Sequence, residues 1–105
     1  MSERFGLSSR ILELLIAGIE RFPEIEEAKI FGSRAMGNFK NGSDIDIALF
    51  GAGVDETVAR RLSTLLNEEL PIPHHVDVVV FDRCTNEALK KHIVQYGKRI
   101  DFISL

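Results

Sequence analysis

Two aspartates that alternate with isoleucines are the feature that most constrains how this chain can fold. The run Ser43-Asp44-Ile45-Asp46-Ile47 has the period of a strand with one face in a core. Side chains of a strand point alternately to its two faces at about 3.3 Å per residue, so Asp44 and Asp46 project from one face with Cα atoms roughly 7 Å apart. Two neighbouring carboxylates repel each other, and a bound divalent cation removes that cost. We therefore expect a strand that holds metal ions.

A glycine and serine turn comes shortly before this strand. Gly32 and Ser33 follow a short apolar segment, and ten residues separate Ser33 from Asp44. We expect a brief helix to begin at Ser33, with its free backbone N–H groups and its positive dipole end facing an incoming phosphate. This pattern thus predicts a phosphate-binding turn next to a pair of acids.

Helical and strand patterns alternate along the whole chain. Apolar residues and cap residues predict helices from Ser8 or Ser9 to Phe22, from Asp55 to Pro71, and from Thr85 to Gly97, with Leu89, Ile93 and Tyr96 facing inward in the last. Strands are predicted over 28–31, from Asp44 to Gly51, over 76–81 and, at an edge, over 99–103. This order is typical of an α/β fold in which helices pack on a small mixed β-sheet.

Length and charge limit the classes of function. At 105 residues we expect a single domain, 1–105, with one core. The chain has 13 basic and 16 acidic residues and a net charge of −3, so it lacks the broad basic surface with which nucleic-acid-binding proteins displace counterions. We therefore expect no stable binding of nucleic acid.

The sequence also argues against export and against a disulfide. Its first residues lack the basic start and apolar stretch of a signal peptide, and no apolar run is long enough to span a bilayer. We expect a cytoplasmic protein that does not enter a membrane. Cys84 is the only cysteine, which excludes an intrachain disulfide.

Together these motifs resemble a known family. The Gly-Ser turn, the spaced Asp-x-Asp, and a third acid, Asp77, within the apolar strand 76–80 are similar to the nucleotidyltransferase superfamily typified by DNA polymerase β. The motif Gly-Ser-Arg-Ala-x-Gly and the closing segment 96–102 resemble those of the smallest members of this superfamily, the minimal nucleotidyltransferase (MNT) proteins. Met36 departs from the pattern, since many relatives carry arginine there. The resemblance implies a DNA polymerase β-like nucleotidyltransferase fold.

The resemblance also implies an activity and assigns roles to residues. A hydroxyl would attack the α-phosphorus of a nucleoside triphosphate, ATP or another, and release pyrophosphate, with two Mg²⁺ ions stabilising the attacking and leaving oxygens. Asp44, Asp46 and Asp77 would be the catalytic metal ligands. Gly32 and Ser33 would bind the β- and γ-phosphates, with Arg34 or Lys40 as a countercharge.

Each of these residues has a simpler structural explanation. Ser33 is also a suitable helix N-cap, and Asp44 a suitable turn residue. Asp82, at the other end of the third strand, is a rival to Asp77, although strand alternation puts the two on opposite faces. Arg34 and Lys40 fit a solvated loop equally well, because long basic side chains in loops are mostly exposed.

Two further residue types invite a function that we do not expect. His74 and His75 are adjacent, so they lack the i, i+4 helical spacing of a zinc pair. Cys84 lies at an expected helix start, where a small, partly buried residue is ordinary, so a thiol nucleophile is not expected there.

Two functions from different classes remain open. MNT proteins are commonly paired with a small helical HEPN-family protein, which the MNT member of toxin–antitoxin pairs neutralises by transferring AMP to a tyrosine. The resemblance thus implies an antitoxin-like enzyme that moves AMP from ATP to a hydroxyl side chain of a HEPN-type partner. The alternative is a noncatalytic module that keeps the fold in order to bind and inhibit a partner protein.

Overall fold

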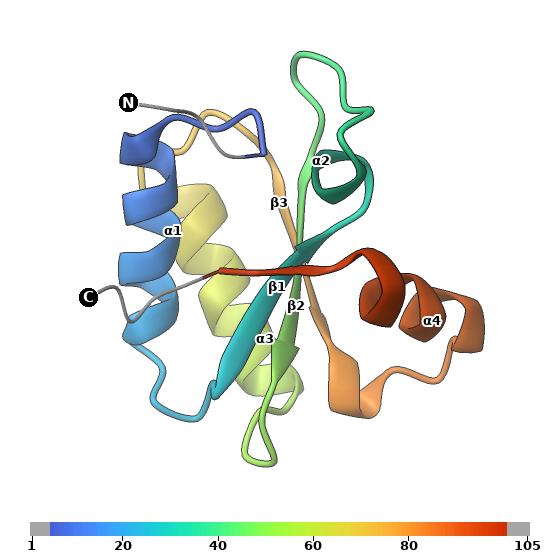
Figure 1. Cartoon of the computed structure of the whole chain (residues 1–105). Coiled ribbons are helices and arrows are strands. Elements are labelled where there is room, and N and C mark those ends of the chain that lie inside the picture. The colour runs from blue at the N-terminus through green and yellow to red at the C-terminus, as the bar shows by residue number, and fades with distance from the viewer. Residues whose placement is uncertain (1–4, 101–105) are drawn as a thin grey trace.

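The computed structural model describes residues 5–100 and consists of one four-stranded sheet with helices on both faces. The helices are α1 (Ser9–Glu20), α2 (Ser33–Met36), α3 (Glu56–Thr64) and α4 (Glu87–Tyr96), with a π-helical turn η1 (Leu65–Glu69) and a 3₁₀ turn η2 (Phe81–Arg83). The strands are β1 (Glu27–Phe31), β2 (Ile45–Phe50), β3 (Val76–Val80) and β4 (Lys98–Arg99). Figure 1 shows this arrangement.

The sheet is mixed and has the order β3-β2-β1-β4. Strand β1 pairs antiparallel with both β2 and β4, whereas β2 and β3 run parallel. The expected fold class, a small mixed sheet with helices packed on it, is confirmed. The expected edge strand is confirmed at Lys98–Arg99, and the rest of the predicted segment, from residue 101 on, lies outside the described residues.

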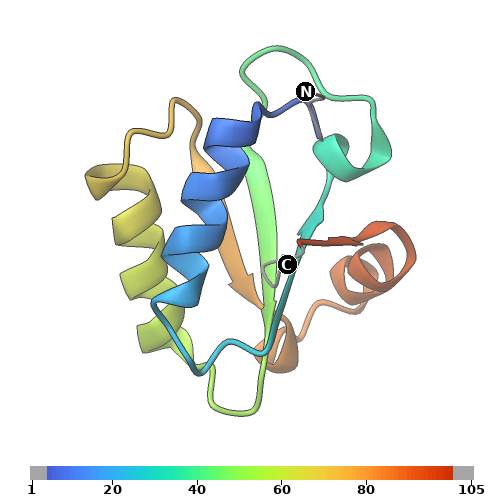
Figure 2. The ribbon, with the colours of Figure 1, turned by 60° about the vertical axis from the view of Figure 1, so that its left-hand side comes forward.

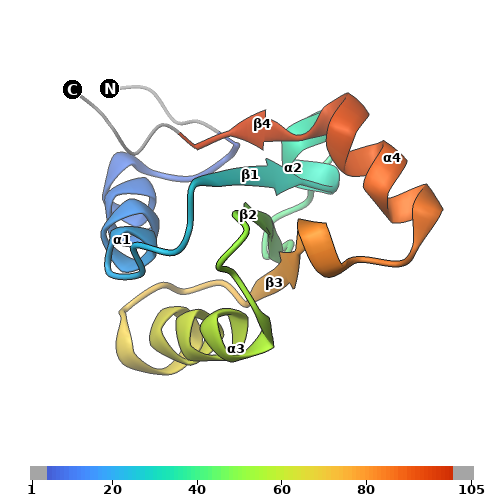
Figure 3. The ribbon, with the colours of Figure 1, turned by 90° about the horizontal axis from the view of Figure 1, so that it is seen from below.

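Helices cover the two faces of the sheet unequally. Figures 2 and 3 show α1 and α3 together on one side of the strands and α4 on the other. The larger core lies under α1 and α3, where Ile45, Ile47 and Leu49 of β2 are completely buried. A smaller core of Phe31, Ala48 and Ile93 lies under α4. The period-2 pattern of β2 therefore directs its isoleucines to one face and Asp46 to the other.

Most helix boundaries follow the expected caps. The side chains of Ser8 and Asp55 accept hydrogen bonds from backbone N–H groups of α1 and α3, as predicted. The cap expected for the last helix is wrong, because the side chain of Asn86, not of Thr85, accepts the bond from Leu89 N. The inward orientation expected for Tyr96 is also wrong, since this residue remains 37% exposed at the end of α4.

No helix in the described part of the chain is long and apolar enough to cross a bilayer.

Candidate functional site

Four polar residues form a compact group where β2 and β3 lie side by side. Asp46 of β2 stands directly opposite Asp77 of β3 in the parallel register. Asp44 precedes β2 and His75 precedes β3, and this end of the pairing is held by a 2.9 Å hydrogen bond from Ile45 N to His75 O. The two residues of each strand segment are two positions apart, so all four lie on one face of the sheet. This is the face that does not contact α1 and α3.

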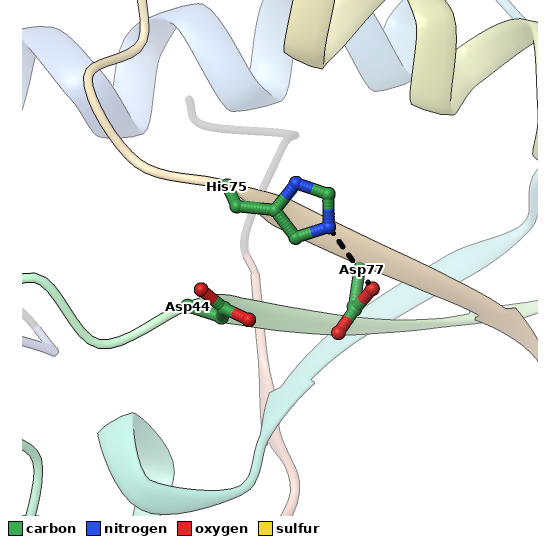
Figure 4. Close-up of side chains that lie close together, drawn as sticks. All are labelled: Asp44, His75 and Asp77. Atoms are coloured by element: carbon green, nitrogen blue, oxygen red, sulfur yellow. Dashed lines mark hydrogen bonds and ion pairs between the residues drawn. The ribbon is translucent and has the colours of Figure 1, made fainter.

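Three members of this group bring their ligand atoms close together. A carboxylate oxygen of Asp44, a ring nitrogen of His75 and a carboxylate oxygen of Asp77 all lie within 4.8 Å of one another, and all three residues are exposed (Figure 4). Nε2 of His75 is 3.2 Å from Oδ1 of Asp77. Carboxylate and imidazole groups are ordinary ligands of divalent cations, so this set fits a metal ion.

Asp46 is the most unusual acid of the group. Its side chain is half-buried, and no described residue donates a hydrogen bond to it. Burial raises the pKa of Asp46, the negative charges of Asp77 and Asp44 raise it further, and His92 and Arg34 act in the opposite direction. A carboxylate kept from water without a hydrogen-bond donor needs a nearby positive charge, and a cation bound among the acids would supply it.

The turn at Gly32 lies against Asp46. Gly32 has a φ of 77°, and a Cβ atom built on it would overlap with Oδ2 of Asp46. Only glycine suits this position, because it lacks a Cβ and adopts positive φ without strain. Gly32 also caps α2 from the backbone, whereas Ser33 is the first helical residue and its side chain makes no cap bond. The simpler explanation of Ser33, a helix cap, is therefore wrong.

His92 supports this turn from α4, a contact that the sequence did not predict. Its Nε2 accepts a 2.9 Å hydrogen bond from the backbone N–H of Gly32, and its ring packs edge-on against Phe31 at 6.0 Å. The acceptor role requires the proton of a neutral His92 to sit on Nδ1. A helical position 60 residues away from the turn carries no sequence signal for this contact.

Arg34 is not available as a countercharge for phosphate, contrary to our expectation. It is only 3% exposed, and its guanidinium donates to the carbonyl oxygen of Ser43 from both Nε (3.1 Å) and Nη2 (2.8 Å) and to that of Phe5 from Nη1 (2.9 Å). Burial lowers the pKa of Arg34, although Asp44 and Asp46 partly oppose that effect. Arg34 thus ties the segment just before Asp44 to the N-terminal segment, and Lys40 remains exposed in the loop.

We expect Arg34→Lys to lower the melting temperature. One ammonium group cannot reproduce the fork of bonds to two carbonyl oxygens, and hydrogen bonds made by charged groups contribute about 1.5–3 kcal/mol each. Lys40→Met is the matched control. It removes an exposed positive charge from the loop between α2 and β2, so it should leave thermal unfolding unchanged. Equal melting temperatures for wild type and Arg34→Lys would contradict the anchoring role.

The remaining candidates have other contacts. Asp82, the rival third acid, is in η2, where its Oδ2 accepts a 3.2 Å hydrogen bond from Gly51 N beyond the opposite end of β2. Nδ1 of His74 is 3.4 Å from Nη2 of Arg34. Cys84 follows η2, and its thiol faces the carbonyl of Asn86 at 3.7 Å. Of the two adjacent histidines, only His75 joins the acids.

Comparison with known proteins identifies a family and a group of similar structures. Residues 13–101 match the model of the polymerase beta nucleotidyltransferase family. A chain of a toxin–antitoxin complex with AMP-PNP is 25% identical, with a TM-score of 0.69 over 90% of this chain and 73% of that one. A chain of the toxin–antitoxin complex MntA–HepT is 22% identical, with a TM-score of 0.68 over 89% and 71% of the two chains.

A third similar structure comes from Shewanella oneidensis. It is a tri-AMPylated HEPN toxin in complex with an MNT antitoxin, and the matched chain is 23% identical, with a TM-score of 0.59 over 85% of this chain and 71% of that one. At these two lower identities the likeness shows the fold alone. No curated protein gives a significant match.

Proposed function

We propose that this chain, which belongs to the polymerase beta nucleotidyltransferase family, transfers AMP from ATP to a hydroxyl group on a HEPN-type partner protein. The observation that carries the proposal is the register of β2 and β3, which aligns Asp46 with Asp77 beside the turn at Gly32. This arrangement puts the acids next to the segment proposed to bind phosphate. Membership of the family supplies the class of reaction, and the acceptor is the finer part of the proposal.

Asp44, Asp46 and Asp77 are proposed to hold the metal ions. Two Mg²⁺ ions fit the carboxylate ligands, and when bound they would neutralise charge on the attacking and leaving oxygens. The half-buried Asp46, which accepts no hydrogen bond from a described residue, supports this assignment because burial and the neighbouring acids outweigh the attraction of His92 and Arg34 for its charge. Asp77 is proposed to lie nearest the attacking hydroxyl, because it is exposed and at the edge of the sheet.

Gly32 and Ser33 are proposed to bind the triphosphate. Gly32 lets the backbone approach the ligand closely, and the hydroxyl of Ser33 has no hydrogen-bond partner among the described residues, so it is free to donate to a phosphate oxygen. His92 would keep the turn in place through its bond with Gly32 N. Arg34 has no phosphate contact in this proposal, because its guanidinium is buried among backbone carbonyls.

A protein acceptor suits this site for two reasons. Asp44, His75 and Asp77 are all exposed, so a side chain carried on the surface of another protein has access to them. The net charge of −3 offers no broad basic surface for a nucleic-acid acceptor. The similar structures include a toxin–antitoxin complex with AMP-PNP and an AMPylated HEPN toxin bound to an MNT antitoxin, which supports a nucleotide and a HEPN-type partner for this chain as well.

Thermal unfolding with and without ATP and Mg²⁺ tests the nucleotide part of the proposal. Ligands that bind only the folded state raise the melting temperature by mass action, so ATP with Mg²⁺ should stabilise the wild-type protein. A module that only binds a partner would show no shift, and that result would favour the noncatalytic alternative.

Ser33→Ala should reduce transfer without abolishing it. The substitution removes one hydroxyl donor, worth about 0.5–1.5 kcal/mol or up to roughly tenfold in rate, while the backbone N–H groups of the turn remain. Initial rates of AMP transfer at several ATP concentrations would measure the loss, with Ser9→Ala in α1 as the control, because Ser9 is an exposed serine far from the turn in the sequence. A loss as complete as that caused by removing the acids would contradict the phosphate role of Ser33.

A further inference from the structure

His75 occupies a place on β3 that mirrors the place of Asp44 on β2. His75 comes two positions before Asp77, as Asp44 comes two positions before Asp46, and the parallel register aligns Asp46 with Asp77. The group therefore has four corners, three of them carboxylates and one an imidazole. The family resemblance accounts for the three acids and leaves the histidine without a role.

The three histidines of the chain have different surroundings. The ring of His74 faces the buried guanidinium of Arg34, and that of His92 accepts the N–H of Gly32. Only His75 belongs to the described group whose ligand atoms lie within 4.8 Å of one another (Figure 4). Its side chain is 58% exposed, so access to an ion is open.

The chemistry of this donor set differs from that of a purely acidic site. Mg²⁺ prefers oxygen ligands, whereas imidazole nitrogen suits first-row transition metals, whose affinities for N/O sites rise along the series from Mn²⁺ to Co²⁺ and beyond. A position with Asp44, His75 and Asp77 combines one nitrogen with carboxylate oxygens. Asp44 and Asp46 without His75 would remain a site of oxygen ligands alone.

We propose that His75 is a metal ligand, and that the position formed by Asp44, His75 and Asp77 binds a first-row transition-metal ion such as Co²⁺ in preference to Mg²⁺. The inference rests on the proposed function in one respect, because it assigns a cation to one of the two metal positions proposed there. Nε2 of His75, which now faces Oδ1 of Asp77 at 3.2 Å, is the nitrogen that would coordinate the ion.

Direct metal binding to the full chain, without ATP or partner, tests this assignment. Co²⁺ and Mg²⁺ would each be titrated into wild type and His75→Asn by calorimetry, and the visible absorption of bound Co²⁺ would be recorded. We expect wild type to prefer Co²⁺, and His75→Asn to lose about tenfold or more in Co²⁺ affinity, within the range for loss of a metal-site partner. Its Mg²⁺ affinity should be unchanged, and the Co²⁺ spectrum should shift.

The adjacent histidine provides a matched control. His74→Gln removes an imidazole that faces Arg34, so it should leave Co²⁺ binding as in wild type, with melting temperatures verifying that both variants fold. Equal loss of both metals in His75→Asn would mean that His75 only orients Asp77, and unchanged Co²⁺ affinity would mean that it plays no part. Either result overturns the proposal. Because no nucleotide is present, neither result depends on whether the chain transfers AMP.

Discussion

Replacing Asp44 and Asp46 together with asparagine is expected to abolish AMP transfer. The two carboxylates are proposed to bind both cations, and the charge stabilisation that bound metals supply is worth several kcal/mol. Each 1.36 kcal/mol is a factor of ten in rate, so we expect a loss of about a thousandfold or more. Transfer of label from ATP to the co-purified partner would measure it.

The same double variant should remain folded. Asp44 is exposed, and burial together with the charges of Asp77 and Asp44 disfavours the ionised form of Asp46 more than the attraction of His92 and Arg34 favours it. Because the pKa of Asp46 is raised above its ordinary value of 3.8, the metal-free protein loses stability as the pH rises through that raised pKa. Asparagine cannot ionise, so at neutral pH the metal-free variant should melt at or above the temperature of wild type.

Asp82→Asn is the matched control for the loss of activity. It removes the rival acid, whose carboxylate accepts the N–H of Gly51 rather than facing Asp46. We expect it to retain transfer even if the lost hydrogen bond lowers the melting temperature. Undiminished transfer by the Asp44 and Asp46 double variant, or inactivity of Asp82→Asn in its folded form, would refute the assignment of the acids.

Local alternation in the sequence is sufficient to predict the strand β2 and the face on which its acid lies. Ile45 and Ile47 are buried under α1 and α3 while Asp46 faces the other way, because adjacent side chains in a strand must diverge. Asp77 and Asp82 are separated for a different reason, because β3 ends at Val80 and Asp82 lies in the turn η2. What alternation cannot give is the pairing of Asp46 with Asp77, which depends on a parallel register between strands that are distant in the sequence.

Contacts between distant segments explain the errors. Arg34 has a guanidinium group, which is suited to binding phosphate. In the folded chain this group is buried because it donates hydrogen bonds to the carbonyl oxygens of Phe5 and Ser43, which come together only on folding. His92 reaches Gly32 across 60 residues. His75 is different, because its spacing from Asp77 repeats that of Asp44 from Asp46. That repeated spacing is a sequence signal for the role proposed for His75, and the helical spacing of zinc pairs does not take it into account.

The partner of this chain is expected to carry AMP. This follows from the proposed transfer to a HEPN-type protein, and the exposed acids leave a side chain on the surface of another protein free to approach. We expect a small helical protein encoded beside this chain to bind it and to be adenylylated on a hydroxyl side chain. Intact mass spectrometry of the co-expressed partner should show one or more added AMP groups.

Co-expression with the Asp44 and Asp46 double variant separates transfer from binding. If the acids hold the metal ions, the partner should lose every AMP addition while it still co-purifies with the variant, because the substitutions should leave the fold intact. A stable complex whose partner stays unmodified with the wild-type chain, even with ATP and Mg²⁺, would contradict the transfer proposal and favour a binding-only role. If the partner is still modified when it is co-expressed with the double variant, Asp44 and Asp46 are not needed for AMP transfer. The assignment of these two acids would then be wrong.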